Sequence, residues 1–91
     1  MSDEFARCAK EIETYVQYLS NEHKANLYGL YKQALFGDAP QAPPPQWQIL
    51  QRAKWNAWDS NRSLSQAEAQ RRYVAIVQAF LRHVVQTPTN C

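Results

Sequence analysis

The sequence has little glycine and cysteine and no long apolar run. Two glycines and two cysteines in 91 residues form no glycine-rich phosphate loop, and Cys8 and Cys91 have neither metal-ligand spacing nor a disulfide framework. No apolar run approaches the roughly 18 residues that a membrane span needs. The acidic, polar opening at residues 1–4 does not form a secretory signal. We therefore expect a cytoplasmic protein of a reducing compartment, without stable membrane insertion.

Catalytic and metal-binding patterns are also missing. No serine or cysteine stands next to a plausible base, and His23 and His83 have no second ligand at helical spacing. Asp38 and Asp59 lie at expected helix ends, where capping and the helix dipole explain acids. We therefore expect no enzyme activity, no metal site and no cofactor.

Length and charge favour binding in a groove. A chain of 91 residues suits one domain, residues 1–91, and is too short for a deep cavity around a large substrate. Its net charge is +2, but residues 1–38 carry four basic and six acidic residues, whereas residues 39–91 carry six basic and two acidic ones. The second part is suited to an anion, or it forms a solvated helix face.

Four segments have helical periodicity, and none alternates as a strand would. The first covers residues 3–19. The second covers residues 21–36, with N-capping by Ser20 and a left-handed C-terminal cap at Gly37. Their apolar stripes consist of Phe5, Ala9, Ile12, Val16 and Leu19, and of Leu27, Leu30, Tyr31, Ala34 and Leu35.

Four prolines interrupt residues 38–46 and predict a loop. A third helix is expected to begin near residues 47–48 and to end near Asn61. Ser65 and Glu68 form a capping-box pattern that opens a fourth helix over residues 66–85. Thr87 and Pro88 end this helix, and the last residues fray. Four amphipathic helices predict an all-α bundle.

Aromatic and basic residues recur together in the second and third helices. Tyr28 and Lys32, four residues apart, share one helical face. Lys54 begins a Lys-Trp-Asn-Ala-Trp run, Arg52 is a second cation nearby, and Tyr73 follows on the fourth helix. An aromatic ring can stack on a base while cations bind phosphates, so this pattern suits a phosphorylated nucleotide. Trp55 and Trp58 are interpreted as structural residues.

Two segments, residues 28–38 and 53–58, followed by Tyr73, resemble the acyl-CoA-binding protein family. The resemblance runs from about Phe5 to about Val84. It implies a four-helix bundle of the up-down-down-up type, which periodicity alone does not select. It also implies a non-catalytic monomer that sequesters and delivers medium- to long-chain fatty acyl-CoA esters.

The resemblance also implies the roles of individual residues. Lys32 and Lys54 would contact the phosphates of coenzyme A, and Tyr28 and Tyr73 the adenosine portion. Other residues would complete the site: Tyr31 at its flank, Arg52 as a further cation, and Ala9 and Leu27 leaving room for the ligand.

The chain departs from the family pattern at several positions. Glu13 replaces a lysine common in the first helix, and Tyr18 stands where many relatives carry a basic residue. Leu50-Gln51-Arg52 keeps one cation of a usually more basic stretch, and Pro44-Pro45 replaces a Pro-Gly turn. These departures bear on affinity and on chain-length preference.

Two alternatives belong to other functional classes. In a helical nucleic-acid-binding module, arginines would contact phosphates, namely Arg62, Arg71, Arg72 and Arg82; the low net charge argues against it. In a protein-interaction bundle with a degenerate acyl-CoA site, Glu13 and Leu50 would mark the lost function.

Overall fold

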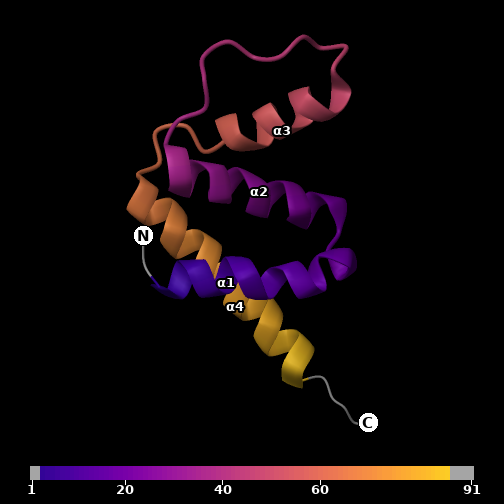
Figure 1. Cartoon of the computed structure of the whole chain (residues 1–91), viewed down its shortest axis with the longest axis vertical. Helices are drawn as coiled ribbons and strands as arrows, with labels where there is room; N and C mark the ends of the chain where they lie inside the picture. Colours follow the sequence, from indigo (N-terminus) through magenta and orange to yellow (C-terminus); the bar gives the residue numbers. More distant parts are fainter. Residues whose placement is uncertain (1–2, 87–91) are drawn as a thin grey trace.

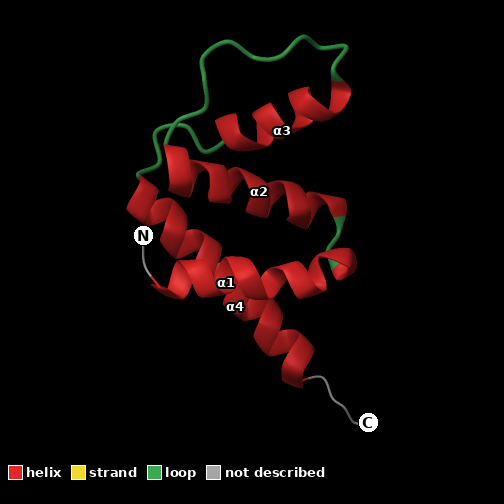
Figure 2. Cartoon of the chain, in the orientation of Figure 1, coloured by secondary structure: helices red, strands yellow, loops and turns green. Residues whose placement is uncertain are grey.

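The computed structural model describes residues 3–86, with side chains up to residue 84. Its elements are α1 (Asp3–Ile12), the 3₁₀ helix η1 (Glu13–Tyr18), α2 (Asn21–Phe36), α3 (Ile49–Asp59) and α4 (Gln66–Gln86). Every regular element in this range is helical (Figure 2). Helices α2 and α3 run in the same direction, while α1 and α4 run the other way (Figure 1). The predicted all-α bundle of the up-down-down-up type is thus confirmed.

The first predicted helix was too long as an α-helix. The α-helical part ends at Ile12, and Glu13–Tyr18 forms a 3₁₀ helix. Thr14, Tyr15 and Val16 are β-branched or aromatic residues of low helix propensity, and the narrower 3₁₀ form is common at helix ends. The Leu19 N–H then donates to the Val16 carbonyl oxygen at 3.1 Å.

Both predicted caps of α2 are present. The Ser20 hydroxyl accepts the His23 N–H at 3.0 Å, which confirms the N-cap. Gly37 has a positive φ of 80°, as the cap requires, but its ψ of −150° is not the left-handed helical value that was predicted. This region of backbone space is essentially restricted to glycine.

Helix α3 begins at Ile49 and ends at Asp59, so the predicted helix was one or two residues too long at both ends. The Gln48 N–H donates to Pro45 at 3.0 Å, forming a turn before the helix. After it, Ser63 takes a positive φ of 77°. The boundaries are set by this turn and by the chain reversal that leads to α4.

Ser65 opens α4 as predicted, because its hydroxyl accepts the Glu68 N–H at 3.0 Å. The reciprocal half of the capping box is replaced, since the Glu68 carboxylate accepts hydrogen bonds from Arg71 and Arg72. These bonds lower the pKa of Glu68, with the Arg71 bond the larger cause. The expected stop at Thr87-Pro88 and the tail lie outside the described residues.

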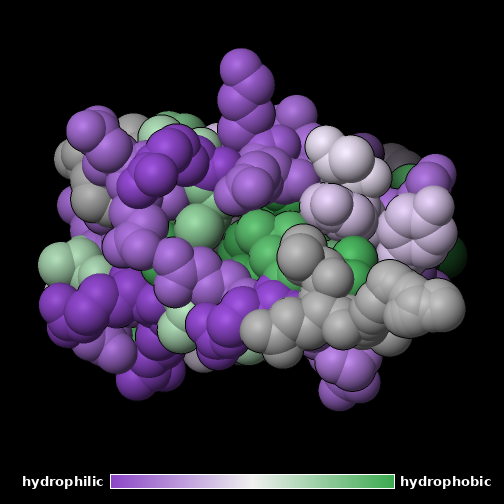
Figure 3. Space-filling view, turned by 90° about the horizontal axis from the view of Figure 1, so that it is seen from below, coloured by the Kyte–Doolittle hydropathy of each residue, from purple (hydrophilic) through white to green (hydrophobic). Residues whose placement is uncertain are grey.

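Helices α1, α2 and α4 form the core. Each of these helices contributes three of the buried residues: Phe5, Cys8 and Ile12 from α1, Leu27, Leu30 and Ala34 from α2, and Ala69, Tyr73 and Val77 from α4. Helix α3 contributes no residue to this buried set, although it packs along α2. From the end at which α4 finishes, hydrophilic side chains surround a hydrophobic area (Figure 3).

Helices α2 and α3 approach each other closely at Gly29. A Cβ added there would lie 2.2 Å from the Ala57 carbonyl oxygen, well inside van der Waals contact. Only glycine therefore allows this backbone approach, which determines how near α3 lies to α2.

The two tryptophans of α3 fasten the proline-rich loop. Trp58 Nε1 donates to the Gly37 carbonyl oxygen at 2.7 Å, and Trp55 Nε1 donates to Pro40 at 2.8 Å. Both tryptophans thus have a structural role, but neither belongs to the buried core, where they were mainly expected. The Asp38 carboxylate accepts from Gln33 and from the Ser63 N–H, and these bonds, with the Gln33 amide as the larger cause, lower its pKa.

Candidate functional site

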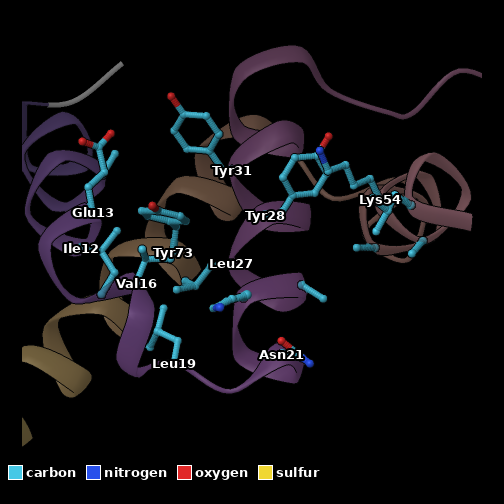
Figure 4. Close-up of a pocket in the computed structure, with 16 residues that line it drawn as sticks. Ile12, Glu13, Val16, Leu19, Asn21, Leu27, Tyr28, Tyr31, Lys54 and Tyr73 are labelled. Atoms are coloured by element: carbon cyan, nitrogen blue, oxygen red, sulfur yellow. The ribbon is translucent and has the colours of Figure 1, made fainter.

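A groove of about 870 Å³ lies along α2, between α1 and η1 on one side and α3 on the other (Figure 4). Most of the residues that line it are apolar. Its charged lining residues are Glu13, Lys24 and Lys54. Such a groove is suited to an elongated, largely apolar molecule that carries an anionic group.

The 3₁₀ geometry of η1 builds one wall. With three residues per turn, side chains three positions apart are aligned. Glu13 and Val16 therefore follow one line, and both face the groove together with Ile12 and with Leu19, which comes directly after η1. In a continued α-helix, residues three positions apart would be offset from one another by about 60°.

Three aromatic rings from three helices pack together at the α1 side. The Phe5 ring lies 5.8 Å from Tyr31 and 5.2 Å from Tyr73, and the Tyr31 and Tyr73 centroids are 5.8 Å apart. Tyr31 and Tyr73 line the groove, whereas Phe5 is buried behind them. Two tyrosines at the groove surface are thus packed against each other and against Phe5.

Tyr73 is almost fully buried but still contacts the groove. Burial raises the pKa of Tyr73 to about 12, and Tyr31, Cys8 and the Glu13 carboxylate add to this effect. The phenol therefore stays neutral at physiological pH and can donate a hydrogen bond into the groove.

Tyr28 lies between two lysines. Lys54 Nζ of α3 is 5.9 Å from the centroid of the Tyr28 ring, and Lys32 Nζ of α2 is also 5.9 Å away. Figure 4 shows the Lys54 side chain extending from α3 towards the Tyr28 ring. The Tyr28–Lys32 pair predicted on one face of α2 is thus joined by Lys54 of α3, so that the aromatic ring has a cation on each of two helices.

Lys32 and Arg52 do not line the groove. Lys32 Nζ lies over Phe36, at 4.6 Å, and over Trp58, at 5.0 Å. Arg52 stacks on Trp55 and donates to the Pro44 carbonyl oxygen at 3.1 Å. Lys32 is therefore next to the groove beside Tyr28, whereas Arg52 fastens the loop.

The other predicted residues, Tyr31, Ala9 and Leu27, all line the groove. Sequence reasoning did not select Lys24, although it stands four residues before Tyr28 and seven before Tyr31, on the same face of α2. This spacing was the signal that could have identified it. The sequence pattern assigned Val16 and Leu19 only to the apolar stripe of the first predicted helix. It did not place them in the groove lining, because that position depends on the 3₁₀ turn.

Similarity to known proteins agrees with this geometry. The family model described as acyl CoA binding protein matches residues 2–77. The chain belongs to the acyl-CoA-binding protein family. The resemblance carried by residues 28–38 and 53–58 is therefore confirmed.

Similar members of the acyl-CoA-binding protein family come from plants and animals. Acyl-CoA-binding domain-containing protein 6 of Arabidopsis thaliana is 37% identical over 81 residues, covering 89% of this chain and 88% of that protein. Acyl-CoA-binding protein homolog 1 of Caenorhabditis elegans is 33% identical, covering 89% and 94% of the two chains. The crystal structure of Oryza sativa acyl-CoA-binding protein 2 is 33% identical and has a TM-score of 0.89, with 96% and 97% of the chains covered.

The arginines of the nucleic-acid alternative are largely engaged within this acyl-CoA-binding protein fold. Arg62 bonds Asp59 and the Ala39 carbonyl oxygen. Arg71 and Arg72 share the Glu68 carboxylate. Asp59 thus compensates the charge of Arg62, and Glu68 compensates one of the two positive charges at the start of α4.

Metal clusters and membrane-spanning helices are both absent from the part of the chain that the structure describes. Among the described residues, no group of three or more His, Cys, Asp or Glu residues is arranged to hold a metal ion. None of the helices in residues 3–86 combines the length and the apolar character needed to cross a membrane.

Proposed function

We propose that this chain is a non-catalytic carrier of fatty acyl-CoA esters, folded as one domain over residues 1–91. The observation that carries the proposal is the Lys54–Tyr28 pair at the edge of a largely apolar groove. Membership of the acyl-CoA-binding protein family supports the ligand class. The carrier would sequester medium- to long-chain esters and deliver them, acting as a monomer in the cytoplasm.

The coenzyme A portion would use the residues around Tyr28. A phosphate oxygen beside Lys54 and Lys32 accepts charge-assisted hydrogen bonds, and the Tyr28 face offers a surface for the adenine. The neutral Tyr73 hydroxyl donates to a polar atom of the adenosine portion, and Tyr31 flanks it. Of the side chains in these contacts, only that of Lys32 lies beside the groove, next to Tyr28, and the others line it.

The acyl chain would extend along the apolar lining. Ile12, Val16 and Leu19 form one side, and Leu27 lies at its base. Ala9, Ala25 and Ala53 are small residues at the groove surface, so they leave room for methylenes.

The two parts of the ligand contribute differently to the binding free energy. Hydrogen bonds to charged groups contribute roughly 1.5 to 3 kcal/mol each, and each buried methylene contributes about 0.8 kcal/mol. About ten buried methylenes thus outweigh any single phosphate contact, even after ordering costs. We expect acyl-CoA to bind far more tightly than free coenzyme A, and a free fatty acid to bind weakly.

A thermal-shift series tests this proposal. The midpoint of unfolding is measured with octanoyl-, dodecanoyl- and hexadecanoyl-CoA, free coenzyme A and the matching free fatty acids. Because a ligand that binds only the folded state stabilises it, the midpoint should rise with the esters and increase with acyl length over a limited range. An unchanged midpoint at saturating ester concentrations would refute the carrier function.

A further inference from the structure

The charged residues that line the groove are divided between its two ends. Figure 4 shows Glu13 and Lys54 at the level of Tyr28, and Asn21 at the other end of the view. Lys24 lies on α2 between Asn21 and Tyr28, about 6 Å along the helix axis from Tyr28. Among the described lining residues, Lys24 is therefore the charged one nearest to the Asn21 end.

Lys24 has no partner for its positive charge within the protein. In the part of the chain that the structure describes, its amino group takes part in none of the ion pairs or cation–π contacts. Lys54, by contrast, faces the Tyr28 ring. An exposed lysine without a partner is usually only solvated, so the surroundings of Lys24 in the groove decide whether it has a further role.

The surroundings of Lys24 are apolar. Leu27 follows it by three residues on the same helix, and Val16 and Leu19 supply the wall on the η1 side. A saturated acyl chain would bury methylenes against this wall, but its terminal methyl group offers nothing to an ammonium group. A chain that ends in an anion would complement both the apolar wall and the cation.

We propose that the groove takes fatty acyl-CoA esters whose acyl chain carries a carboxylate at its far end, and that Lys24 recognises this carboxylate. The inference rests on the proposed function, because it requires the acyl chain to lie along the η1 wall. The Asn21 amide, three residues before Lys24, supplies a second donor at this end. Since Lys24 is exposed, the carboxylate remains partly hydrated, which limits the cost of desolvation.

The acids near the groove do not cancel the charge of Lys24. Glu13 lies at the level of Tyr28 (Figure 4), and Glu22 is not among the residues that line the groove. Lys24 therefore acts on a terminal carboxylate without a lining acid next to it.

Calorimetric titration with matched pairs of esters tests the proposal. Octanoyl- and dodecanoyl-CoA are compared with octanedioyl- and dodecanedioyl-CoA, which differ from them only in the terminal carboxylate. For at least one of the two lengths, Lys24→Gln should bind the carboxylate-terminated ester at least about tenfold more weakly than wild type, because it loses a charge-assisted hydrogen bond. Its affinity for the methyl-terminated ester should change by less than about twofold, since no such bond is lost.

Two further variants make the assignment specific. Lys24→Arg keeps the charge, so it should keep the affinity for the carboxylate-terminated ester. Lys10→Gln is the matched control, because Lys10 is an exposed lysine of α1 outside the groove lining, and it should bind both classes of ester as wild type does. The selective loss in Lys24→Gln should also shrink as ionic strength rises.

The outcomes separate this inference from the carrier function. If wild type bound the methyl-terminated esters but Lys24→Gln showed no selective loss, or if wild type did not bind the carboxylate-terminated esters, only this inference would fail. Equal weakening of both ester classes and of free coenzyme A would assign Lys24 to the phosphates and would also overturn it. If wild type bound no ester of either class, the carrier function would fail and this inference with it.

Discussion

Lys54 of α3 holds its amino group 5.9 Å from the centroid of the Tyr28 ring on α2. One turn further along both helices, Lys32 of α2 lies 5.0 Å from the Trp58 ring of α3. The two contacts are reciprocal: α3 supplies the cation in the first and α2 supplies it in the second. They define a parallel register between α2 and α3, and this register places a cation beside an aromatic face at the groove.

Replacing each lysine should separate binding from stability. Lys54→Ala should weaken acyl-CoA binding by about 1.5 to 3 kcal/mol with little change in stability, since Lys54 is exposed and would bond a phosphate. Lys32→Ala should weaken binding and also lower the free energy of unfolding by about 0.5 to 1 kcal/mol, because it removes contacts with Phe36 and Trp58. Calorimetry and urea denaturation measure the two effects. Loss of stability in Lys54→Ala alone would contradict this assignment.

Glu13 should oppose the anionic ligand. It is the acidic residue that lines the groove, so Glu13→Gln should raise acyl-CoA affinity by about 1 kcal/mol at low salt, and Glu13→Lys by more. The gain should shrink as ionic strength rises. Glu11→Gln is the control, since Glu11 is an exposed acid outside the groove lining. If both Gln variants behaved alike, Glu13 would have no specific effect.

Gly29→Ala should loosen the α2–α3 contact. The new Cβ would meet the Ala57 carbonyl oxygen, and overpacking of this kind costs about 1 to 3 kcal/mol. The gain in helix propensity is about 1 kcal/mol, so we expect a net loss of stability and weaker ester binding as Lys54 moves away from Tyr28. Asn26→Ala, an exposed change in the same helix, should keep both. Undiminished stability in Gly29→Ala would show that the helices separate without cost.

Tyr73 should make folding sensitive to high pH. Its pKa is raised from 10 to about 12, so the folded state retains a proton that the unfolded state loses between these values. The contribution of Tyr73 to stability is therefore constant below about pH 10 and falls by about 2 kcal/mol towards pH 12. Denaturation curves should show this fall in the wild type and in Tyr18→Phe, whose ring is exposed, but much less in Tyr73→Phe. If the free energy of unfolding fell equally with pH in all three proteins, burial of Tyr73 would not be the cause.

Local rules predicted the parts of the fold that depend on local chemistry. Ser20 and Ser65 cap α2 and α4 because a serine hydroxyl before a helix accepts an unsatisfied N–H. The arrangement of the four helices required the family resemblance, since amphipathic stripes fit several bundle topologies. The 3₁₀ helix was missed because its residues continue the α-helical apolar pattern, although the low helix propensity of Thr14, Tyr15 and Val16 was a local signal for it.

The candidate site was predicted in part for similar reasons. Tyr28, Tyr31 and Tyr73 lie at the groove as expected. Arg52 does not, because its guanidinium bonds the Pro44 carbonyl oxygen and stacks on the Trp55 ring. The sequence alone does not show that these two groups are within reach of Arg52. The stripe of Glu13 and Val16 depends on the 3₁₀ turn. No residue pattern predicts such placements without the contacts between elements.

Calorimetric titration with dodecanoyl-CoA, hexadecanoyl-CoA and free coenzyme A, on wild type and Lys54→Ala, tests the central claim most directly. The account predicts one-to-one binding of the esters, much weaker binding of free coenzyme A, and a clear loss of ester affinity in the variant. No heat of binding with either ester, or equal affinity of wild type and Lys54→Ala, would contradict a carrier whose phosphate contact is Lys54.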